Sequence, residues 1–310
     1  MKFFEDDSLL VLVGDCREQM AAMDAQSVQT IVTSPPYWGL RDYGNPGQLG
    51  QEPTPDAYVE AMIQVFREAK RVLRDDGTLW LNLGDTYSAQ RWTGKGEGQP
   101  INKKKDGHRD LNLVRESGLP DKNLVGIPWK VAFALQADGW ILRSEIIWHK
   151  PGVMPEPVTD RPTRAHEQIF LFAKQQKYHY DHEAIKEPAV TGAWDALPPI
   201  GGKKHPGENG NPKYSGNQPA SDGMRNKRDV WTVSIKPYAG AHFATFPPDL
   251  IEPCILAGAP TGGVVLDPFG GSGTTGMVAN RLSRKAVLIE LNPEYAEQIK
   301  ERCRQAALGL

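Results

Sequence analysis

Short apolar runs alternate with amphipathic stretches along much of this chain, which is the pattern of an α/β protein. The continuous apolar runs at 9–13 and 28–32 predict strands that are buried on both faces, as in a parallel sheet. Apolar side chains then repeat at a helical period over 54–73. Thr54 and Pro55 suit the N-cap and the first position of that helix.

The alternation of strands and helices continues to the C-terminus, with two interruptions. Gly77 is expected to end the first long helix, before a strand at 78–83. The further predicted elements are helices at 128–138, 249–257, 274–282 and 293–307 and strands at 141–148, 168–173, 263–266 and 285–291. The segments 88–122 and 186–242 are rich in glycine and basic residues and lack periodicity, so they are predicted to be long loops that either contact DNA or are merely solvated and flexible.

Composition narrows the class of protein. The chain has 310 residues, of which 39% are hydrophobic, and a formal net charge of −2. Its acidic N-terminus and the lack of a long apolar run predict a soluble, cytoplasmic protein without a membrane partner. The three widely spaced cysteines argue against a disulfide framework or a zinc site. A nucleic acid would have to bind a local basic face, because the overall charge does not attract it.

A glycine-rich turn near the C-terminus, VVLDPFGGSGTTG at 264–276, predicts a nucleoside site. Glu290 ends the next strand, where an acid bonds ribose hydroxyls in nucleoside-binding α/β folds. A P-loop is disfavoured, because Thr274 rather than lysine follows Gly273, and the dinucleotide motif is matched only weakly. S-adenosylmethionine is cationic and lacks a pyrophosphate, so Asp267 at the strand end suits it. An NAD-dependent oxidoreductase is the alternative, although no hydride-transfer constellation is evident.

A second motif, TSPPYW at 33–38, directly follows a predicted buried strand. Its prolines cannot continue a central strand, so they end it in a stiff loop. Together with DPFGGSGTT at 267–275, this motif strongly resembles the amino-methyltransferases that modify exocyclic amines of DNA bases. The motif order resembles the beta class of that family, which is a circular permutant, and the resemblance covers nearly the whole chain.

The resemblance implies a Rossmann-like α/β methyltransferase fold, with a seven-stranded, mostly parallel sheet and helices on both faces. Residues 1–185, including the basic loop 88–122, would form the catalytic half of the domain. Residues 186–242 would form an irregular target-recognition insertion, and 243–310 the cofactor-binding half of the same domain. The two motifs would then end neighbouring strands, and the chain termini would lie close together.

The resemblance also implies an activity: site-specific methyl transfer from S-adenosylmethionine, without a metal, to a base flipped out of double-stranded DNA. Ser34 Oγ and the Pro35 carbonyl would accept hydrogen bonds from the target amine, Pro36 would stiffen the loop, and Tyr37 would stack on the base. Asp15 would bind the adenine amino group and Glu290 the ribose. The other implied cofactor residues are Thr33, Phe243, Thr245, Phe246, Asp267, Pro268, Phe269, Gly270, Gly271, Ser272, Gly273 and Thr274.

Several alternatives concern the reaction itself. Serine before Pro-Pro-Tyr is typical of cytosine N4 enzymes in this family, so cytosine N4 is predicted, with adenine N6 as the alternative. An inactive methyltransferase fold that binds DNA as a regulator is a different class. Cytosine carbon-5 methylation needs a cysteine nucleophile, and Cys254 lies on a predicted helix where core packing is expected. A restriction endonuclease for the same site and a homodimer are the further partners considered.

Basic and aromatic residues outside the two motifs are candidates for contact with DNA or the flipped base. They are Trp38, Lys103, Lys104, Lys105, Trp148, Lys150, Arg225, Lys227 and Arg228. Trp38 is expected either to form a second wall of the base pocket or to pack in the core. Asp85 ends a strand on the same edge, where capping of a helix or loop is the alternative to a role in the site.

Overall fold

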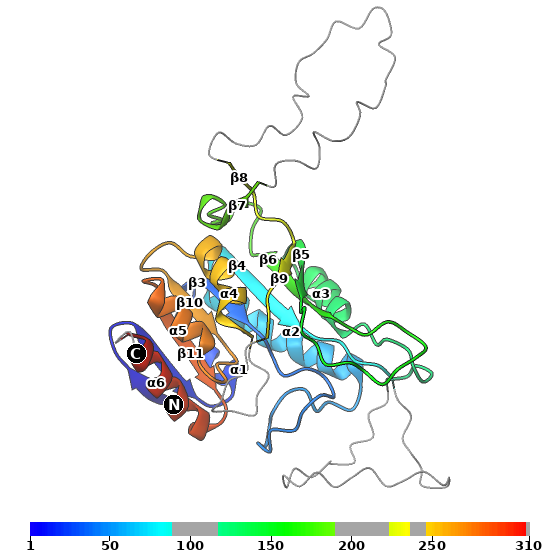
Figure 1. Ribbon diagram of the computed structural model, residues 1–310. Coiled ribbons are helices and arrows are strands. Elements are labelled where there is room, and N and C mark those ends of the chain that lie inside the picture. Colours follow the sequence, from blue (N-terminus) through cyan, green and yellow to red (C-terminus); the bar gives the residue numbers. More distant parts are fainter. Residues whose placement is uncertain (89–116, 190–222, 236–245, 308–310) are drawn as a thin grey trace, which may run out of the picture.

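A nine-stranded sheet runs through the part of the chain that this computed structural model describes, residues 1–88, 117–189, 223–235 and 246–307 (Figure 1). Its strands are β1 (Lys2–Glu5), β2 (Leu9–Val13), β3 (Val28–Thr33), β4 (Leu73–Leu83), β5 (Ile141–His149), β6 (His166–Ala173), β9 (Val230–Thr232), β10 (Val264–Asp267) and β11 (Lys285–Glu290). Their order is β1-β2-β11-β10-β3-β4-β6-β5-β9. A separate pair joins β7 (Glu187–Pro188) and β8 (Met224–Arg225).

The centre of the sheet is parallel and brings distant parts of the chain together. Neighbours in the series β2, β11, β10, β3 and β4 all pair in parallel, whereas β6 runs antiparallel to β4 and β5. The ends of β3 and β10 therefore lie at one edge, as the sequence predicts. The expected strand number of seven is wrong, because two short strands extend the edges: β1 pairs antiparallel with β2, and β9 pairs with β5.

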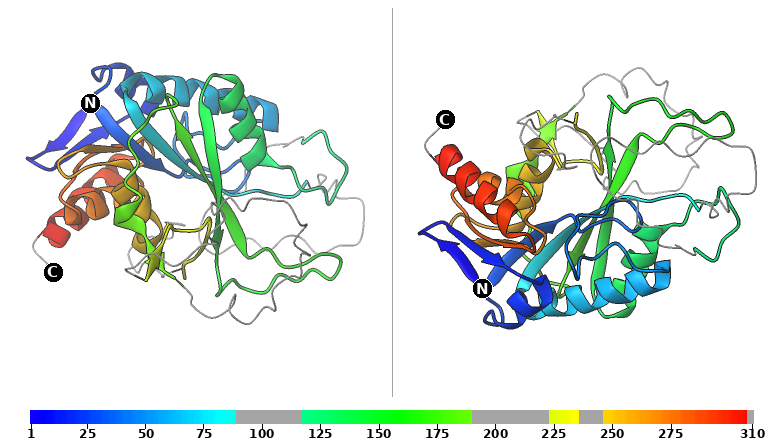
Figure 2. Two further views of the ribbon diagram at one scale, coloured as in Figure 1. Left: turned by 90° about the horizontal axis from the view of Figure 1, so that it is seen from above. Right: turned by 90° about the horizontal axis from the view of Figure 1, so that it is seen from below.

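Helices cover both faces of the sheet (Figure 2). One face carries α1 (Cys16–Ala21), α2 (Pro55–Val72) and α3 (Ile127–Ala137), and the other carries α4 (Pro248–Gly258), α5 (Thr274–Arg281) and α6 (Pro293–Ala307). A 3₁₀ turn, η1 (Glu183–Ile185), packs beside α4. Successive strand residues feed opposite cores, with Ile31 in the first and Val32 in the second. This two-sided burial explains the continuous apolar runs in the sequence.

The start of α2 is confirmed, but its predicted end is wrong. Thr54 Oγ1 accepts a hydrogen bond from the backbone N–H of Ala57, 3.1 Å away, and Pro55 is the first helical residue. The helix ends at Val72, because Leu73 already has extended backbone angles and begins β4. Gly77 lies within that strand. A Cβ there would lie 2.5 Å from Leu73 Cγ, so close packing, rather than a helix stop, explains the glycine.

The first strand and the last helix lie beside one another, as the sequence predicts for the two ends of the chain. The guanidinium of Arg304 in α6 lies 5.6 Å from the ring centroid of Phe4 in β1. Figure 1 shows β1, at the start of the chain, and α6 at the same side of the molecule. None of the helices in the described ranges has the length and apolar character needed to cross a membrane.

Gly258, at the end of α4, allows that helix to approach the sheet closely. A Cβ at this position would lie 2.5 Å from Thr30 Oγ1, 2.8 Å from Thr78 Oγ1 and 2.9 Å from Trp80 Nε1. These three groups already bond one another: the threonine hydroxyls are 2.9 Å apart, and Trp80 Nε1 donates to Thr78 Oγ1. A methyl group here would therefore push α4 away from a buried polar cluster.

We expect Gly258→Ala to destabilise the protein by about 1–3 kcal/mol, because the new methyl group overpacks this contact. The measurement is the free energy of unfolding in urea. Gly152→Ala is the matched control, since a Cβ there meets no atom within 4 Å. Equal stability of the two variants would show that α4 does not pack this tightly.

Candidate active site

A pocket opens where the parallel strands β2, β11, β10 and β3 end at their carboxyl edge. The predicted site residues that line it are Asp15, Ser34, Pro35, Pro36, Tyr37, Phe246, Asp267, Pro268, Phe269, Gly270, Gly271, Ser272, Thr274 and Glu290. The loop that follows the catalytic motif completes the wall with Leu40, Arg41, Tyr43 and Gln48, which the sequence did not indicate. The structure thus brings the two sequence motifs to one pocket.

Asp267 connects the two motifs. Thr33 Oγ1, at the end of β3, donates to Asp267 Oδ1 at 2.6 Å, and Thr275 Oγ1 in α5 donates to Oδ2 at 2.7 Å. The backbone N–H of Phe269 also donates to Oδ1, at 3.0 Å. Because the residue is only 2% exposed and both oxygens have donors, its carboxylate joins the catalytic strand to the glycine-rich turn.

Glu290 holds the other side of the glycine-rich turn. Its Oε2 accepts from the backbone N–H of Gly271 at 2.8 Å, and its Oε1 from that of Asn292 at 2.9 Å. Each carboxylate oxygen keeps a further lone pair for a ligand. Burial raises the pKa of Glu290, although these backbone N–H groups act in the opposite direction. A Cβ at Gly270 would lie 3.2 Å from the carbonyl oxygen of Ile289, so the turn passes close to β11.

Arg302, in α6, fixes the same turn from outside the pocket. Its Nη1 donates to the carbonyl oxygen of Ser272 at 3.0 Å, to Ser272 Oγ at 2.7 Å and to Thr274 Oγ1 at 3.0 Å. Nothing in the sequence pattern indicated this residue, because a basic side chain on an amphipathic helix usually faces solvent. The turn is therefore held by side chains from two later elements.

Side chains from α2, β4 and β6 hold the loop of the catalytic motif. Tyr58 Oη in α2 donates to the carbonyl oxygen of Pro36 at 3.0 Å. Tyr37 Oη lies 2.9 Å from Glu167 Oε2 and 3.0 Å from Asn82 Oδ1. The sequence indicated neither Asn82 nor Glu167 for the site. A polar side chain inside the apolar run TLWLNL was the only available signal for Asn82.

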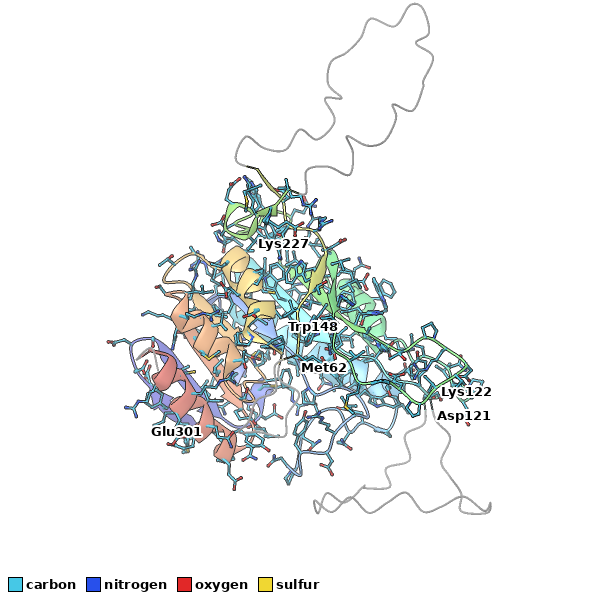
Figure 3. All side chains as sticks on the ribbon, in the orientation of Figure 1. Met62, Asp121, Lys122, Trp148, Lys227 and Glu301 are labelled. Atoms are coloured by element: carbon cyan, nitrogen blue, oxygen red, sulfur yellow. The ribbon has the colours of Figure 1, made fainter. Side chains whose placement is uncertain are left out.

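Two tryptophans that were candidates for contact with the base or DNA lie in the core, which for Trp38 is one of the two expected alternatives. Trp38 is 4% exposed, and its Nε1 donates to the carbonyl oxygen of Glu52, so packing is the role that the structure shows. Trp148 is 3% exposed, and its Nε1 donates to the carbonyl oxygen of Val233. Figure 3 shows Trp148 in the middle of the molecule. Lys150 packs over the Trp148 ring at 4.0 Å from its centroid, and it forms an ion pair with Glu167.

The predicted basic contacts near β8 have partners within the protein. Arg225 and Arg228 both donate to Glu187 Oε1, at 2.9 Å and 2.7 Å. Lys227 Nζ lies 5.0 Å from the ring centroid of Trp231, and Figure 3 shows it at the end of the molecule that carries β7 and β8. The remaining predicted residues lie outside the described part of the chain: Lys103, Lys104, Lys105, Phe243 and Thr245.

The surroundings of Asp85 and Cys254 decide two alternatives that the sequence left open. Asp85 Oδ1 accepts from the backbone N–H groups of Gly126 and Ile127, at 2.9 Å and 3.0 Å, so Asp85 caps α3. Cys254 is buried in α4, where burial raises the pKa of its thiol, and core packing is the role that it has. Within the described ranges, no group of three or more potential metal ligands comes together.

The burial of the Asp267 carboxyl group predicts how the stability of the protein depends on pH. Burial raises its pKa from 3.8 to about 7 in the folded protein. Between these values the folded protein keeps a proton that the unfolded chain releases, so this group lowers stability as pH rises from about 4 to about 7. Asparagine does not ionise. The stability of wild type relative to Asp267→Asn should therefore decrease over this range, by at most about 1.4 kcal/mol per pH unit.

Urea denaturation of both proteins at several pH values measures this difference. A stability difference that stays constant from about pH 4 to about pH 7 would contradict a raised pKa for Asp267.

Comparisons with known proteins agree on one family. The DNA methylase family (N6_N4_Mtase) matches residues 28–301. The type II methyltransferase M.SmaI from Serratia marcescens is 46% identical to this chain over 297 residues, which are 95% of this chain and 90% of that protein.

Solved structures agree with the fold. The structure of a putative DNA modification methylase from Thermus thermophilus, complexed with S-adenosyl-L-methionine, superposes with a TM-score of 0.58 and 26% identity. The match covers 97% of this chain and 96% of that one. The PvuII DNA methyltransferase (cytosine-N4-specific) superposes with a TM-score of 0.62 over 98% of this chain and 94% of that one; at 19% identity, this likeness concerns the fold alone. The chain therefore belongs to the DNA methylase family and is an enzyme that methylates DNA.

Proposed function

We propose that this enzyme transfers a methyl group from S-adenosylmethionine to an exocyclic amine of a base flipped out of double-stranded DNA, and that the amine is cytosine N4. The observation that carries this proposal is the shared pocket: the Ser34–Pro35 loop and the glycine-rich turn line it together, joined through Asp267. The serine before Pro-Pro-Tyr supports cytosine N4, and adenine N6 is the alternative.

The residues of the pocket fit S-adenosylmethionine. Asp15, which follows β2 as the N-cap of α1, and Glu290, at the end of β11, supply carboxylate acceptors for a nucleoside, and Phe269 and Phe246 supply apolar surface. The Asp15 carboxylate also accepts from the Arg17 side chain. A Cβ at Gly270 or Gly273 would press on β11 or α6, so the turn already lies close to the elements behind it. We assign Glu290 to the ribose hydroxyls, Asp15 to the adenine amino group, and the turn to the methionine end.

S-adenosylmethionine would supply a methyl group on a sulfonium. An N–C bond forms to the base amine while the C–S bond breaks with its electron pair on sulfur, and the nitrogen then releases one proton to water. The protein prepares the amine, whose lone pair is otherwise delocalised into the ring. Ser34 Oγ and the Pro35 carbonyl oxygen accept hydrogen bonds from the amine. The hydrogen bond from Tyr58 to the Pro36 carbonyl oxygen fixes the loop. Such positioning is worth up to about 7–11 kcal/mol in well-oriented reactions.

The remaining assignments concern DNA. We assign residues 186–242 to recognition of the target sequence and the loop 88–122 to contacts with the phosphate backbone of DNA, because both segments are rich in basic residues. The strand order is consistent with a permuted chain, since β2 and β3 precede β10 and β11 in sequence but flank them in the sheet. A restriction endonuclease for the same site and a homodimer stay predictions.

Expression in a host that lacks its own DNA methylases, followed by sequencing that reports modified bases, tests the function. We expect N4-methylcytosine at one short sequence. N6-methyladenine there would establish the alternative base, and absence of any modification would favour a regulator without activity.

Glu290→Ala should weaken the binding of S-adenosylmethionine about 10- to 100-fold, because a charged acceptor is lost from the pocket. Titration calorimetry without DNA gives the dissociation constant, and a urea denaturation curve checks that the variant folds. Glu294→Ala is the control, since that exposed side chain lies in the first turn of α6 outside the pocket. Unchanged affinity in Glu290→Ala would remove Glu290 from the cofactor site.

A further inference from the structure

A chain of hydrogen bonds leads from the pocket wall into the sheet. Ser34 Oγ donates to Tyr37 Oη, 3.3 Å away. Tyr37 Oη in turn lies 2.9 Å from Glu167 Oε2, at the start of β6, and 3.0 Å from Asn82 Oδ1, near the end of β4. The chain thus connects the serine proposed to receive the target amine with a carboxylate on another strand.

Glu167 and Asn82, at the inner end of this series of hydrogen bonds, fix the direction in which the bonds run. An ionised carboxylate can only accept hydrogen bonds. The Asn82 amide nitrogen donates to the carbonyl oxygen of Gln168 at 3.1 Å and to Glu167 Oε2 at 3.3 Å, which leaves its oxygen facing Tyr37. Both groups that face Tyr37 from the sheet are therefore acceptors, so the single Tyr37 proton points inward.

Lys150 completes the inner end. Its Nζ forms an ion pair with Glu167 Oε1, and the two side chains are only 13% and 18% exposed. An ammonium carries donors alone, so this contact again uses Glu167 as an acceptor. Lys150 is itself held over the Trp148 ring, 4.0 Å from its centroid. Lys150 thus contacts Oε1, and the other carboxylate oxygen, Oε2, faces Tyr37 and the Asn82 amide.

The orientation of Ser34 follows from this direction. Since the Tyr37 proton points to the sheet, Tyr37 Oη can only accept from Ser34, and the one proton of Ser34 points to Tyr37. The lone pairs of Ser34 Oγ remain for the target amine. An amine on a base presents hydrogens, so a serine proton turned toward it would repel it.

We propose that Glu167 is a positioning residue for methyl transfer: acting through Tyr37, it holds Ser34 as a hydrogen-bond acceptor toward the amine. This inference rests on the proposed function. Between Ser34 and Glu167, the Ser34–Tyr37 hydrogen bond, at 3.3 Å, is longer than the Tyr37–Glu167 one, at 2.9 Å. We expect it to shorten when a base fills the pocket. The role also separates two functions of Tyr37, because its ring can stack while its hydroxyl orients Ser34.

Two variants test the relay. In Glu167→Gln, Lys150 retains the amide oxygen, so the amide nitrogen faces Tyr37 and the carboxylate acceptor is lost. Tyr37→Phe keeps the ring and removes only the hydroxyl. We expect kcat to decrease about 10- to 100-fold in each, with the dissociation constant for S-adenosylmethionine unchanged. The double variant should be no slower than the worse single one, because both changes break one chain.

The measurements are single-turnover methylation of a duplex carrying the mapped site, calorimetry with S-adenosylmethionine, and urea denaturation. Glu297→Gln, at an exposed ion pair on α6, is the matched control and should keep wild-type kcat. Wild-type kcat in Glu167→Gln, or effects that multiply in the double variant, would overturn the relay while the proposed function stands. If Glu167→Gln does not fold, Tyr37→Phe decides alone, and full kcat in it overturns the inference. A wild-type enzyme that methylates no DNA overturns both proposals.

Discussion

The buried carboxylate of Asp267 is the constraint on which the rest of the site depends. A charge this deep is costly unless each oxygen has donors, and here the donors come from β3, from α5 and from the turn between β10 and α5. Satisfying Asp267 therefore requires the catalytic strand and the glycine-rich turn to sit at one fixed distance. The proposed reaction needs the same geometry, since the amine and the methyl group must meet in line.

The same principle holds along the carboxyl edge of the sheet. Several polar groups there are held by a partner from a different element: Glu290 by the turn after β10, that turn by Arg302 of α6, and Tyr37 by Asn82 and Glu167 of β4 and β6. Loops that leave a sheet edge are usually the most variable part of an α/β fold. Here these long-range bonds restrict their positions, so the pocket is built before a ligand binds.

The sequence predicted the elements better than the side-chain partners. Strands that are buried on both faces and helices with one apolar face leave a local pattern, and both motifs stand next to such elements. The prediction that Gly77 ends the helix was wrong. Glycine is needed there because the residue packs closely against Leu73 inside β4, and no pattern of turn residues reveals such a contact. Arg302 and Glu167 lie far in sequence from Ser272 and Tyr37, to which they are hydrogen-bonded, so no local pattern links them. Trp38 and Trp148 were candidates for the base pocket or DNA, with core packing as the alternative for Trp38, and their indole N–H groups donate to backbone carbonyls in the core.

These bonds do not themselves depend on the order of the two motifs along the chain. β3 and β10 pair at only two register positions, Thr30 with Val265 and Ile31 with Leu266. Beyond them, the two ends are joined by Thr33 and Thr275 through one carboxylate, not by a connecting loop. A site held in this way needs no continuity of chain between its halves. It needs only that the strands be neighbours and that each buried acceptor find its donors.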